Sequence, residues 1–201
     1  MTHHRDKSGT TSPATDTATG SAREPATESV GDHTPAGATV AVITVSDRSS
    51  RGERADTSGP RAVELLRDAG YQVTATIVPD GEDSVNTAIS AAITAGAHIV
   101  ITSGGTGIGP RDLTPEGTRP LITRELPGIA EELRRHGASN NRMAVLSRGL
   151  AGIADPTGSA GRPPGALVVN LPGSVKAVEE GLEVLLPLLP HLLGQLRGSD
   201  H

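Results

Sequence analysis

The strongest constraint on this chain is a strand-then-helix pattern that begins at Thr39. Thr39–Val45, with the sequence TVAVITV, is a continuous and mostly β-branched run. Such a run, without polar alternation, is typical of a strand that is buried on both faces of a sheet. After a polar loop over 46–59, Pro60 suits a first helical position, apolar residues recur at helical spacing, and Gly70 is a natural helix stop. The pattern predicts a strand, a loop and a helix.

The same unit recurs along the chain. Tyr71–Val78 predicts a second strand, and Asp83 or Ser84 can cap a helix that ends at Gly96. Later patterns predict strands at His98–Thr102 and Ala166–Asn170 and a helix over Ile129–His136. Thr114 and Pro115 are expected to form the cap and first turn of another helix, and Ser174 is expected to cap a C-terminal helix that runs through Leu186. Because strands alternate with helices, we expect an α/β fold of three layers, Rossmann-like in topology, with a mostly parallel sheet and helices on both faces.

The N-terminal residues differ in composition from the rest of the chain. Residues 1–37 are rich in Thr, Ser, Ala, Pro and Gly and have no apolar periodicity. Such a segment buries too little apolar surface to offset its ordering entropy, so we expect a disordered tail followed by one domain over 38–201. No apolar run reaches the length of a membrane span, and no apolar segment follows Arg5 and Lys7 as in a secretory signal. We therefore expect a cytoplasmic protein with no membrane partner.

Composition excludes several kinds of chemistry. The chain has no Cys, which removes disulfides, thiolate metal sites and cysteine nucleophiles. Its formal net charge is -5 and Tyr71 is its single aromatic residue. Nucleic-acid binding draws on basic surfaces and stacking rings, so we expect no nucleic-acid partner.

The most unusual stretch is ITSGGTGIGPRDLTPEG, which starts at Ile101. Gly104, Gly105, Gly107 and Gly109 let main-chain N–H groups approach an anion, and Thr106 adds a hydroxyl donor. A Walker-type loop would require a Lys followed by Ser or Thr, which is missing here, and the G-x-G-x-x-G offsets also fail. The stretch therefore predicts an anion site of another kind, the alternative being a tight strand-to-helix connection without ligand.

Charged side chains adjoin this glycine loop. Arg111 offers a planar cation for phosphate, whereas Asp112 would repel an anion unless a divalent cation lay between them, which suggests Mg²⁺. Asp80, at the end of the second strand, is a second ligand, a residue that orients the attacking group, or a turn residue in VPDGED. The carboxyl ends of parallel strands meet at one sheet edge, so we expect one site built from four loops. These loops contain Ser46, Asp47 and Arg48; Pro79 and Asp80; the glycine loop; and Leu171, Pro172 and Gly173.

Five ordered motifs carry a family resemblance. They are TVSDRSSRGERADTSGP, VPDGED, ITSGGTGIGPRDLTPE, MAVLSRGLAG and VVNLPGS. From Thr39 to Leu193 the chain resembles the MoaB and MogA family of molybdenum cofactor biosynthesis proteins, which includes the gephyrin G domain and its plant counterpart. The resemblance implies molybdopterin adenylyltransferase activity, in which the molybdopterin phosphate attacks the α-phosphorus of MgATP and pyrophosphate is released.

The resemblance also implies roles for individual residues. Asp80 and Asp112 are the expected catalytic residues and magnesium ligands, and Ser147 is expected to contact the pterin or its phosphate. The full expected substrate-binding set is Ser46, Asp47, Ser103, Gly104, Gly105, Thr106, Gly107, Arg111, Ser147, Pro172 and Gly173. The implied partners are molybdopterin, ATP as co-substrate, other molybdenum cofactor biosynthesis proteins, and further copies of the chain in a trimer or hexamer.

Two other functions stay open at this point. One is a molybdopterin-binding or scaffold paralogue without efficient adenylylation, and the other is a stand-alone relative of the domain in CinA-type proteins. Two segments depart from the family pattern: Asn140–Met143, expected at the rim of the pterin pocket, and Ala154–Gly165, expected to be a surface insertion.

Overall fold

A computed structural model describes residues 37–155 and 165–198 of the chain. The expected tail over 1–37 and the expected insertion over 154–165 therefore lie almost wholly outside the described residues. The strands are β1 (Thr39–Val45), β2 (Gln72–Val78), β3 (Ile99–Ser103), β4 (Arg124–Glu125), β5 (Ala151–Ala154) and β6 (Ala166–Leu171). The helices are α1 (Asp47–Ser50), α2 (Ser58–Asp68), α3 (Glu82–Thr94), α4 (Thr114–Thr118), α5 (Pro127–Asn140), α6 (Val175–Leu185), α7 (Leu189–Leu196) and the short 3-10 helices η1 (Arg119–Leu121) and η2 (Arg142–Leu146).

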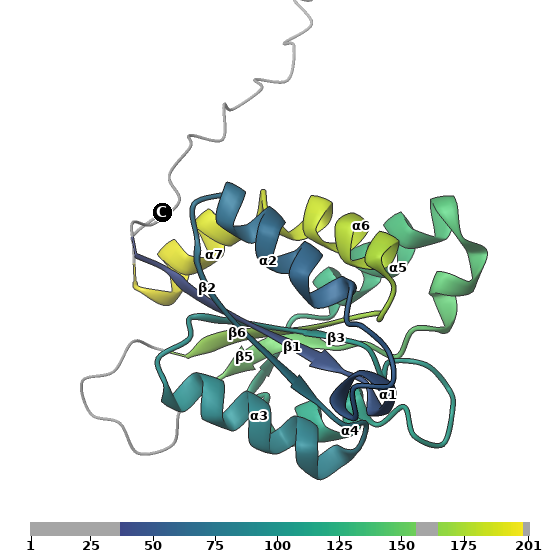
Figure 1. Cartoon of the computed structure of the whole chain (residues 1–201). Coiled ribbons are helices and arrows are strands. Elements are labelled where there is room, and N and C mark those ends of the chain that lie inside the picture. Colours follow the sequence, from purple (N-terminus) through teal and green to yellow (C-terminus); the bar gives the residue numbers. More distant parts are fainter. Residues whose placement is uncertain (1–36, 156–164, 199–201) are drawn as a thin grey trace, which may run out of the picture. The chain divides into compact units, whose positions relative to one another are not determined.

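The described strands form one mixed sheet in the order β2-β1-β3-β6-β5-β4 (Figure 1). The pairs among β2, β1, β3 and β6 are parallel, whereas β5 and β4 are antiparallel to their neighbours. The register places Thr44 of β1 beside Ser103 of β3, and Ser103 beside Leu171 of β6. The loops that follow these three strands consequently start next to one another.

Alternate residues of the central strands pack against helices on opposite faces of the sheet. Val40 and Val42 belong to a core that includes residues of α2, α5, α6 and α7, whereas Ala41 and Ile43 pack with residues of α3. Figure 1 shows this division, with α2, α5, α6 and α7 on one side of the sheet and α3 and α4 on the other. The period-two direction of strand side chains explains why TVAVITV has no polar alternation. The expected three-layer α/β fold is confirmed.

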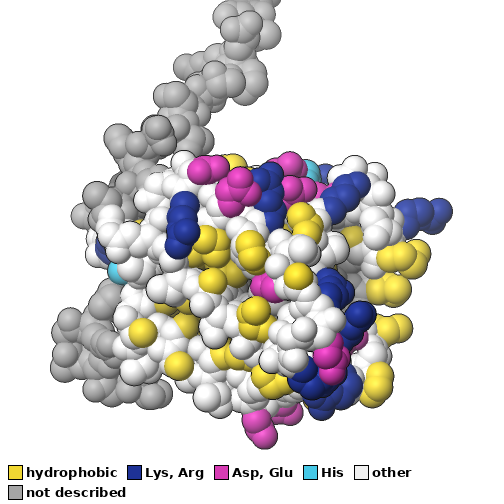
Figure 2. Space-filling view, in the orientation of Figure 1, with side chains coloured by type: hydrophobic (Ala, Val, Ile, Leu, Met, Phe, Trp, Pro, Cys, Tyr) yellow, Lys and Arg dark blue, Asp and Glu magenta, His cyan; other side chains and the backbone are white. Residues whose placement is uncertain are grey.

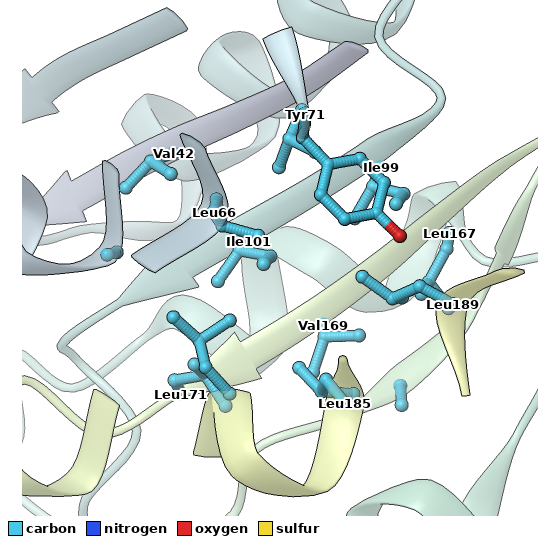
Figure 3. Close-up of a cluster of buried hydrophobic side chains, with 14 of the residues drawn as sticks. Val42, Leu66, Tyr71, Ile99, Ile101, Leu167, Val169, Leu171, Leu185 and Leu189 are labelled. Carbon is cyan, nitrogen blue, oxygen red and sulfur yellow. The ribbon is translucent and has the colours of Figure 1, made fainter. Parts of the chain in front are cut away.

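The larger core, part of which is drawn in Figure 3, includes the single aromatic residue, Tyr71. It also takes up Leu182, Leu185 and Leu189, whose side chains are fully buried. These leucines therefore belong to the core of the chain. On the face drawn in Figure 2, acidic and basic side chains lie beside one another. None of the helices in the described ranges is long and apolar enough to cross a membrane.

The sequence predicted four of the strands and missed two. The predictions at Thr39–Val45, Tyr71–Val78, His98–Thr102 and Ala166–Asn170 correspond to β1, β2, β3 and β6. Strand β5 has only four small or apolar residues, AGIA, and β4 has two exposed residues, so neither has a periodic pattern. Their pairing with β6 and with each other defines them as strands.

Helix starts required correction, because tertiary hydrogen bonds decide them. Helix α2 begins at Ser58 and not at Pro60: the Asp56 carboxylate accepts hydrogen bonds from the amides of Ser58 (3.1 Å) and Gly59 (3.0 Å) and so satisfies its first N–H groups. Helix α3 is preceded by Gly81 as its N-cap, and Ser84 lies inside the first turn, donating its hydroxyl to the Gly81 carbonyl.

The structure also contains two helices that the sequence did not predict, and it decides the two remaining cap predictions. Helix α1 lies within the expected polar loop, and α7 follows the expected C-terminal helix. Thr114 is the first residue of α4 and not its cap, since its hydroxyl donates to the Gly104 carbonyl at 2.8 Å. The prediction for Ser174 is confirmed: its side chain caps α6 by accepting a hydrogen bond from the Ala177 amide at 3.2 Å.

Candidate functional site

A pocket of approximately 510 Å³ opens at the carboxyl edge of the parallel strands. It lies where the loops after β1, β3 and β6 meet. The expected site residues that line it are Ser46, Ser103, Gly104, Gly105, Thr106, Gly107, Asp112, Ser147, Pro172 and Gly173. A pocket of this volume is of the size that small-molecule ligands occupy. The structure thus brings most of the expected residues together.

The glycine loop requires glycine at its start for steric reasons. Gly104 has φ +113°, and a Cβ there would overlap with the Val45 carbonyl oxygen. Gly105 has φ +63°, and a Cβ there would overlap with the Thr114 hydroxyl. Gly173, from the loop after β6, is in contact with Gly104: a Cβ on Gly173 would lie 3.1 Å from the Gly104 Cα. The loops after β3 and β6 therefore pass so close to each other and to neighbouring groups that these positions have no room for a side chain.

Three main-chain donors of this pocket-lining loop have no protein acceptor among the described residues. The Gly104 amide donates to the Leu171 carbonyl at 3.0 Å, which anchors the loop to β6. Within the described residues, the amides of Gly105, Thr106 and Gly107 donate no hydrogen bond to a protein acceptor. Unpaired amides in a lining loop can bind an anion, because they present partial positive charge without Cβ atoms in the way.

Arg148 holds the other part of the loop. Its Nε donates to the Gly107 carbonyl at 2.7 Å, and its Nη2 donates to the Asp112 carbonyl. Its Nη1 pairs with Glu116 Oε1 at 2.5 Å, and its own amide donates to the Thr106 carbonyl at 2.9 Å. The hydrogen bond from Arg148 lowers the pKa of the Glu116 carboxyl below its usual value. Sequence reasoning missed this role, because only the fold brings the residue after Ser147 to these carbonyls.

Two expected catalytic carboxylates lie against the same loop. Asp112 Oδ2 accepts a hydrogen bond from the Gly109 amide at 2.9 Å, and a Cβ on Gly107 would lie 2.7 Å from it. Asp80 Oδ1 is 3.3 Å from the position that a Cβ would take on Gly105. The loop therefore has a carboxylate near its first half and another near its second half.

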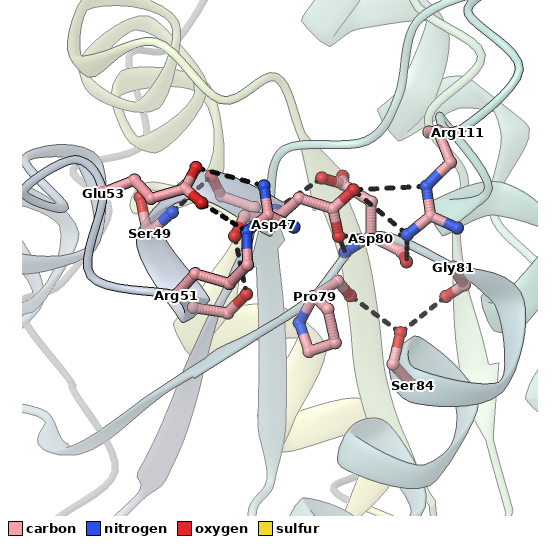
Figure 4. A network of polar contacts seen from close by, with 11 residues as sticks. Asp47, Ser49, Arg51, Glu53, Pro79, Asp80, Gly81, Ser84 and Arg111 are labelled. Carbon is pink, nitrogen blue, oxygen red and sulfur yellow. Dashed lines mark hydrogen bonds and ion pairs between the residues drawn. The ribbon is translucent and has the colours of Figure 1, made fainter.

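Asp80 also belongs to a polar network beside the pocket, drawn in Figure 4. Its Oδ2 accepts from the Asp47 amide at 2.7 Å, and its own amide donates to Asp47 Oδ1 at 3.1 Å. Arg111 Nη2 donates to Asp47 Oδ1 at 3.0 Å and to the Asp80 carbonyl at 2.7 Å. The hydrogen bonds from Arg111 lower the pKa of the Asp47 carboxyl. Asp47, Asp80 and Arg111 flank the pocket-lining residues and are not themselves among them.

A second polar group, which the sequence did not predict, lies under the glycine loop. Thr44 donates its hydroxyl to Asp56 Oδ2 at 2.6 Å, while Ser103 donates to Ser58 Oγ at 3.2 Å. Thr44, Asp56 and Ser58 line the pocket together with Ser103. In the sequence Asp56 is only a polar residue ahead of a helix. Its contact with Thr44 forms because the loop after β1 folds back toward the end of that strand.

The remaining wall is formed by α5, η2 and α6. Asn141 and Met143, from the segment expected at the rim, line the pocket, and the Asn141 side chain accepts a hydrogen bond from the Met143 amide at 3.1 Å. Lys176 and Glu180 of α6 line it as well. Among the residues that the structure describes, no group of three or more His, Asp or Glu side chains is placed to hold a metal ion by protein ligands alone.

Comparison with known proteins agrees with this architecture. Residues 41–191 match the family described as a probable molybdopterin binding domain. The chain is 42% identical over 157 residues to a molybdopterin adenylyltransferase of Pyrococcus furiosus, covering 78% of this chain and 89% of that protein. It is 42% identical over 167 residues to a molybdenum cofactor biosynthesis bifunctional protein of Synechococcus elongatus, covering 83% of this chain but only 50% of that longer protein.

A solved structure gives the same result. The tungsten cofactor synthesizing protein MoaB from Pyrococcus furiosus superposes with a TM-score of 0.72 at 40% identity, over 81% of this chain and 99% of that one. The agreement therefore covers both the sequence and the fold over most of this chain. The chain belongs to the family of probable molybdopterin-binding domains that includes MoaB and MogA.

Proposed function

We propose that the chain is a molybdopterin adenylyltransferase. In this reaction an oxygen of the molybdopterin phosphate forms a bond to the α-phosphorus of ATP. The bond from that phosphorus to the bridging oxygen of the β-phosphate breaks, and pyrophosphate leaves with the electron pair. The observation that carries the proposal is the row of unpaired amides at Gly105, Thr106 and Gly107 in a pocket of ligand size. Relatives that carry this enzyme name occur in Pyrococcus furiosus and, at 32% identity, in Helicobacter pylori.

The chemistry asks the protein to align two anions and to stabilise charge on the transferred phosphoryl group. The loop amides would bind phosphate oxygens, and they are pre-oriented because Gly104 is anchored to Leu171 and Gly107 to Arg148. Phosphate is already a nucleophile at neutral pH, so no strong general base is required. Positioning and electrostatic stabilisation are therefore sufficient, as in other phosphoryl transfers.

The residues present fit a magnesium ion shared with the substrates. Mg²⁺ is commonly held by one or two carboxylates together with substrate phosphates, and not by an all-protein cage. Asp112 and Asp80, on either half of the glycine loop, supply such a pair, and they would hold the ion there. Bound Mg²⁺ would supply neutralisation of phosphate charge. Asp47 orients Asp80 through its amide at 2.7 Å, so it would act by positioning.

The test is adenylylation by the purified chain. We expect molybdopterin and MgATP to yield adenylylated molybdopterin and pyrophosphate, measured by product chromatography and a coupled pyrophosphate assay. Asp112→Asn should reduce turnover at least about 100-fold, the scale at which loss of one charge-stabilising group acts, while pterin binding persists. Asp83→Asn, an exposed acid on α3, is the matched control and should retain full activity.

A negative result would separate the alternatives. A wild-type chain that binds molybdopterin but never releases pyrophosphate would contradict the enzyme and support the binding or scaffold paralogue. Asp112 would then serve only to hold the loop through the Gly109 amide. We also propose that the chain acts in the cytoplasm as a trimer or hexamer, alongside other cofactor biosynthesis proteins; light scattering of the purified chain tests the subunit number.

A further inference from the structure

Helix α6 contributes one acidic side chain to the pocket. The Glu180 side chain is 13% exposed, and its Oε1 is enclosed without accepting any hydrogen bond. The nearest cation is Lys176 Nζ at 3.7 Å, one turn earlier on the same helix and beyond hydrogen-bonding distance. An enclosed carboxylate without donors is destabilising unless something supplies them. Because Glu180 lines the pocket and 13% of its side chain is exposed, a ligand can supply donors to the carboxylate, and it reaches Oε1 when the side chain turns toward the pocket.

Small residues surround this carboxylate. Gly137, Ala144 and Ala177 line the pocket beside it. A Cβ on Gly137 would lie 3.0 Å from the Ala144 Cβ and 3.7 Å from Glu180 Oε2. Larger side chains at these positions would fill the space next to the carboxylate, whereas the small side chains present leave that space open to a ligand. These small residues leave room beside the carboxylate for a ligand group that carries hydrogen-bond donors.

Two parts of the pocket lining leave hydrogen-bonding groups of opposite kind unpaired. The glycine loop presents unpaired donors, and Glu180 presents unpaired acceptors. A complementary ligand therefore has a phosphate at one end and N–H donors at the other. Adenine offers one amino donor beside a ring acceptor, which would repel the second carboxylate oxygen. The 2-amino-4-oxo pyrimidine ring of a pterin offers two adjacent N–H donors, the arrangement that a carboxylate accepts best.

We propose that Glu180 recognises the amino-pyrimidine edge of the pterin and excludes rings without that pair of donors. The proposal rests on the proposed function, since it assigns the pterin and not the nucleotide base to this wall. It makes Glu180 a specificity-determining residue for the same pocket. It also gives a role to the acidic Glu180 side chain in a pocket whose glycine loop has amides suited to an anion.

The test compares two pteridine phosphates that differ at one group. The probes are 6-hydroxymethylpterin phosphate and its lumazine counterpart, in which an oxo group replaces the 2-amino group. Binding is followed by fluorescence anisotropy of the pteridine, without ATP. We expect the wild type to prefer the pterin by roughly 10- to 100-fold, the scale of one or two hydrogen bonds to a charged group. Glu180→Gln should lose about 10-fold or more in pterin affinity, with the preference falling to within about 3-fold.

Glu183→Gln is the matched control, because Glu183 lies on the same helix, has a side chain 67% exposed, and pairs with His136 outside the pocket lining. It should leave affinity and preference unchanged. Thermal denaturation separates binding from folding: Glu180→Gln should be as stable as the wild type or more so, because it removes an enclosed charge that no hydrogen bond satisfies.

Several results would overturn the proposal. These are a Glu180→Gln variant with wild-type pterin affinity and preference, a wild type that does not distinguish the two probes, or one that binds neither. The outcome is separable from that of the proposed function. A wild type that selects the pterin through Glu180 but never releases pyrophosphate contradicts only the adenylyltransferase. A chain that turns over normally with Glu180→Gln contradicts only the role of Glu180.

Discussion

Replacing Arg148 by Met tests whether the shape of the glycine loop depends on this residue. The substitution keeps most of the aliphatic stem and removes the guanidinium. The carbonyls of Gly107 and Asp112 would then lose their charged donor, and Glu116 would lose its ion pair. Because Asp112 follows the loop directly, a change in loop shape would displace the expected catalytic carboxylate.

The magnitude follows from these contacts. A hydrogen bond to a charged group contributes about 1.5–3 kcal/mol when enclosed. The Arg148 side chain is 37% exposed, so water replaces part of this, and we assign about 1–2 kcal/mol to each carbonyl. The pair with Glu116, whose side chain is 38% exposed, adds no more than about 1 kcal/mol. The two carbonyls and the ion pair together give about 2–5 kcal/mol, which corresponds to roughly 30- to 4,000-fold in kcat/KM, at about 1.4 kcal/mol for each factor of ten.

The assay is pyrophosphate release at varied ATP and molybdopterin, together with thermal denaturation. We expect a large fall in kcat/KM with only a few degrees lost in Tm, because the contacts lie in one loop and not in the core. Arg119→Met is the control: Arg119 pairs with Glu125 on the surface, both side chains being more than half exposed, and its loss should cost less than about 0.5 kcal/mol. Equal activities for the two variants would refute the reasoning.

Two further predictions concern stability. Gly104→Ala should lower the unfolding free energy by at least about 1 kcal/mol more than the control Gly52→Ala. Both glycines have positive φ, but only a Cβ on Gly104 would overlap with a neighbour, the Val45 carbonyl. Equal losses for the two variants in urea denaturation would contradict the steric argument. Burial lowers the pKa of His98, and Arg197 adds to the effect, while the Thr39 amide donates to Nδ1 of the neutral ring at 3.2 Å. The unfolded chain therefore takes up the proton first as the pH falls below about 6.5, so stability should decrease there, and His98→Asn should flatten that slope in urea titrations at pH 7, 6 and 5; an unchanged slope would assign the effect to other groups.

The parts of the fold that could be predicted from the sequence are those decided by local pattern. TVAVITV is buried on both faces, so its composition alone identifies β1. Strand β5 has the sequence AGIA and is defined by its antiparallel pairing with β6, which no local sequence pattern predicts. The start of α2 depends on the Asp56 carboxylate, whose position depends in turn on Thr44 of β1. Elements whose ends are set by distant partners were therefore displaced by a few residues or missed.

The same distinction applies to the pocket. Topology alone predicts that the loops after β1, β3 and β6 converge, because parallel strands end at one edge. Glycine at Gly104 and Gly105 also follows from local geometry, since both have positive φ. Glu180, in contrast, lies on a helix where an acid is typical of a solvent-facing position. Only the packing of α6 beside α5 shows that its carboxylate is enclosed.

The two arginines of the site show why residue type is a weak guide to role. Arg111 stands beside the glycine loop in sequence and so suggests a phosphate ligand, yet its guanidinium donates to Asp47 and to the Asp80 carbonyl. Arg148 is distant in sequence, yet it binds two carbonyls of the loop segment. A guanidinium donates to whichever acceptors the fold places within reach. A phosphate that binds Nε or Nη2 of Arg111 must compete with Asp47 for them, so weakening that pair by Asp47→Asn would show whether these two donors are then available to substrate.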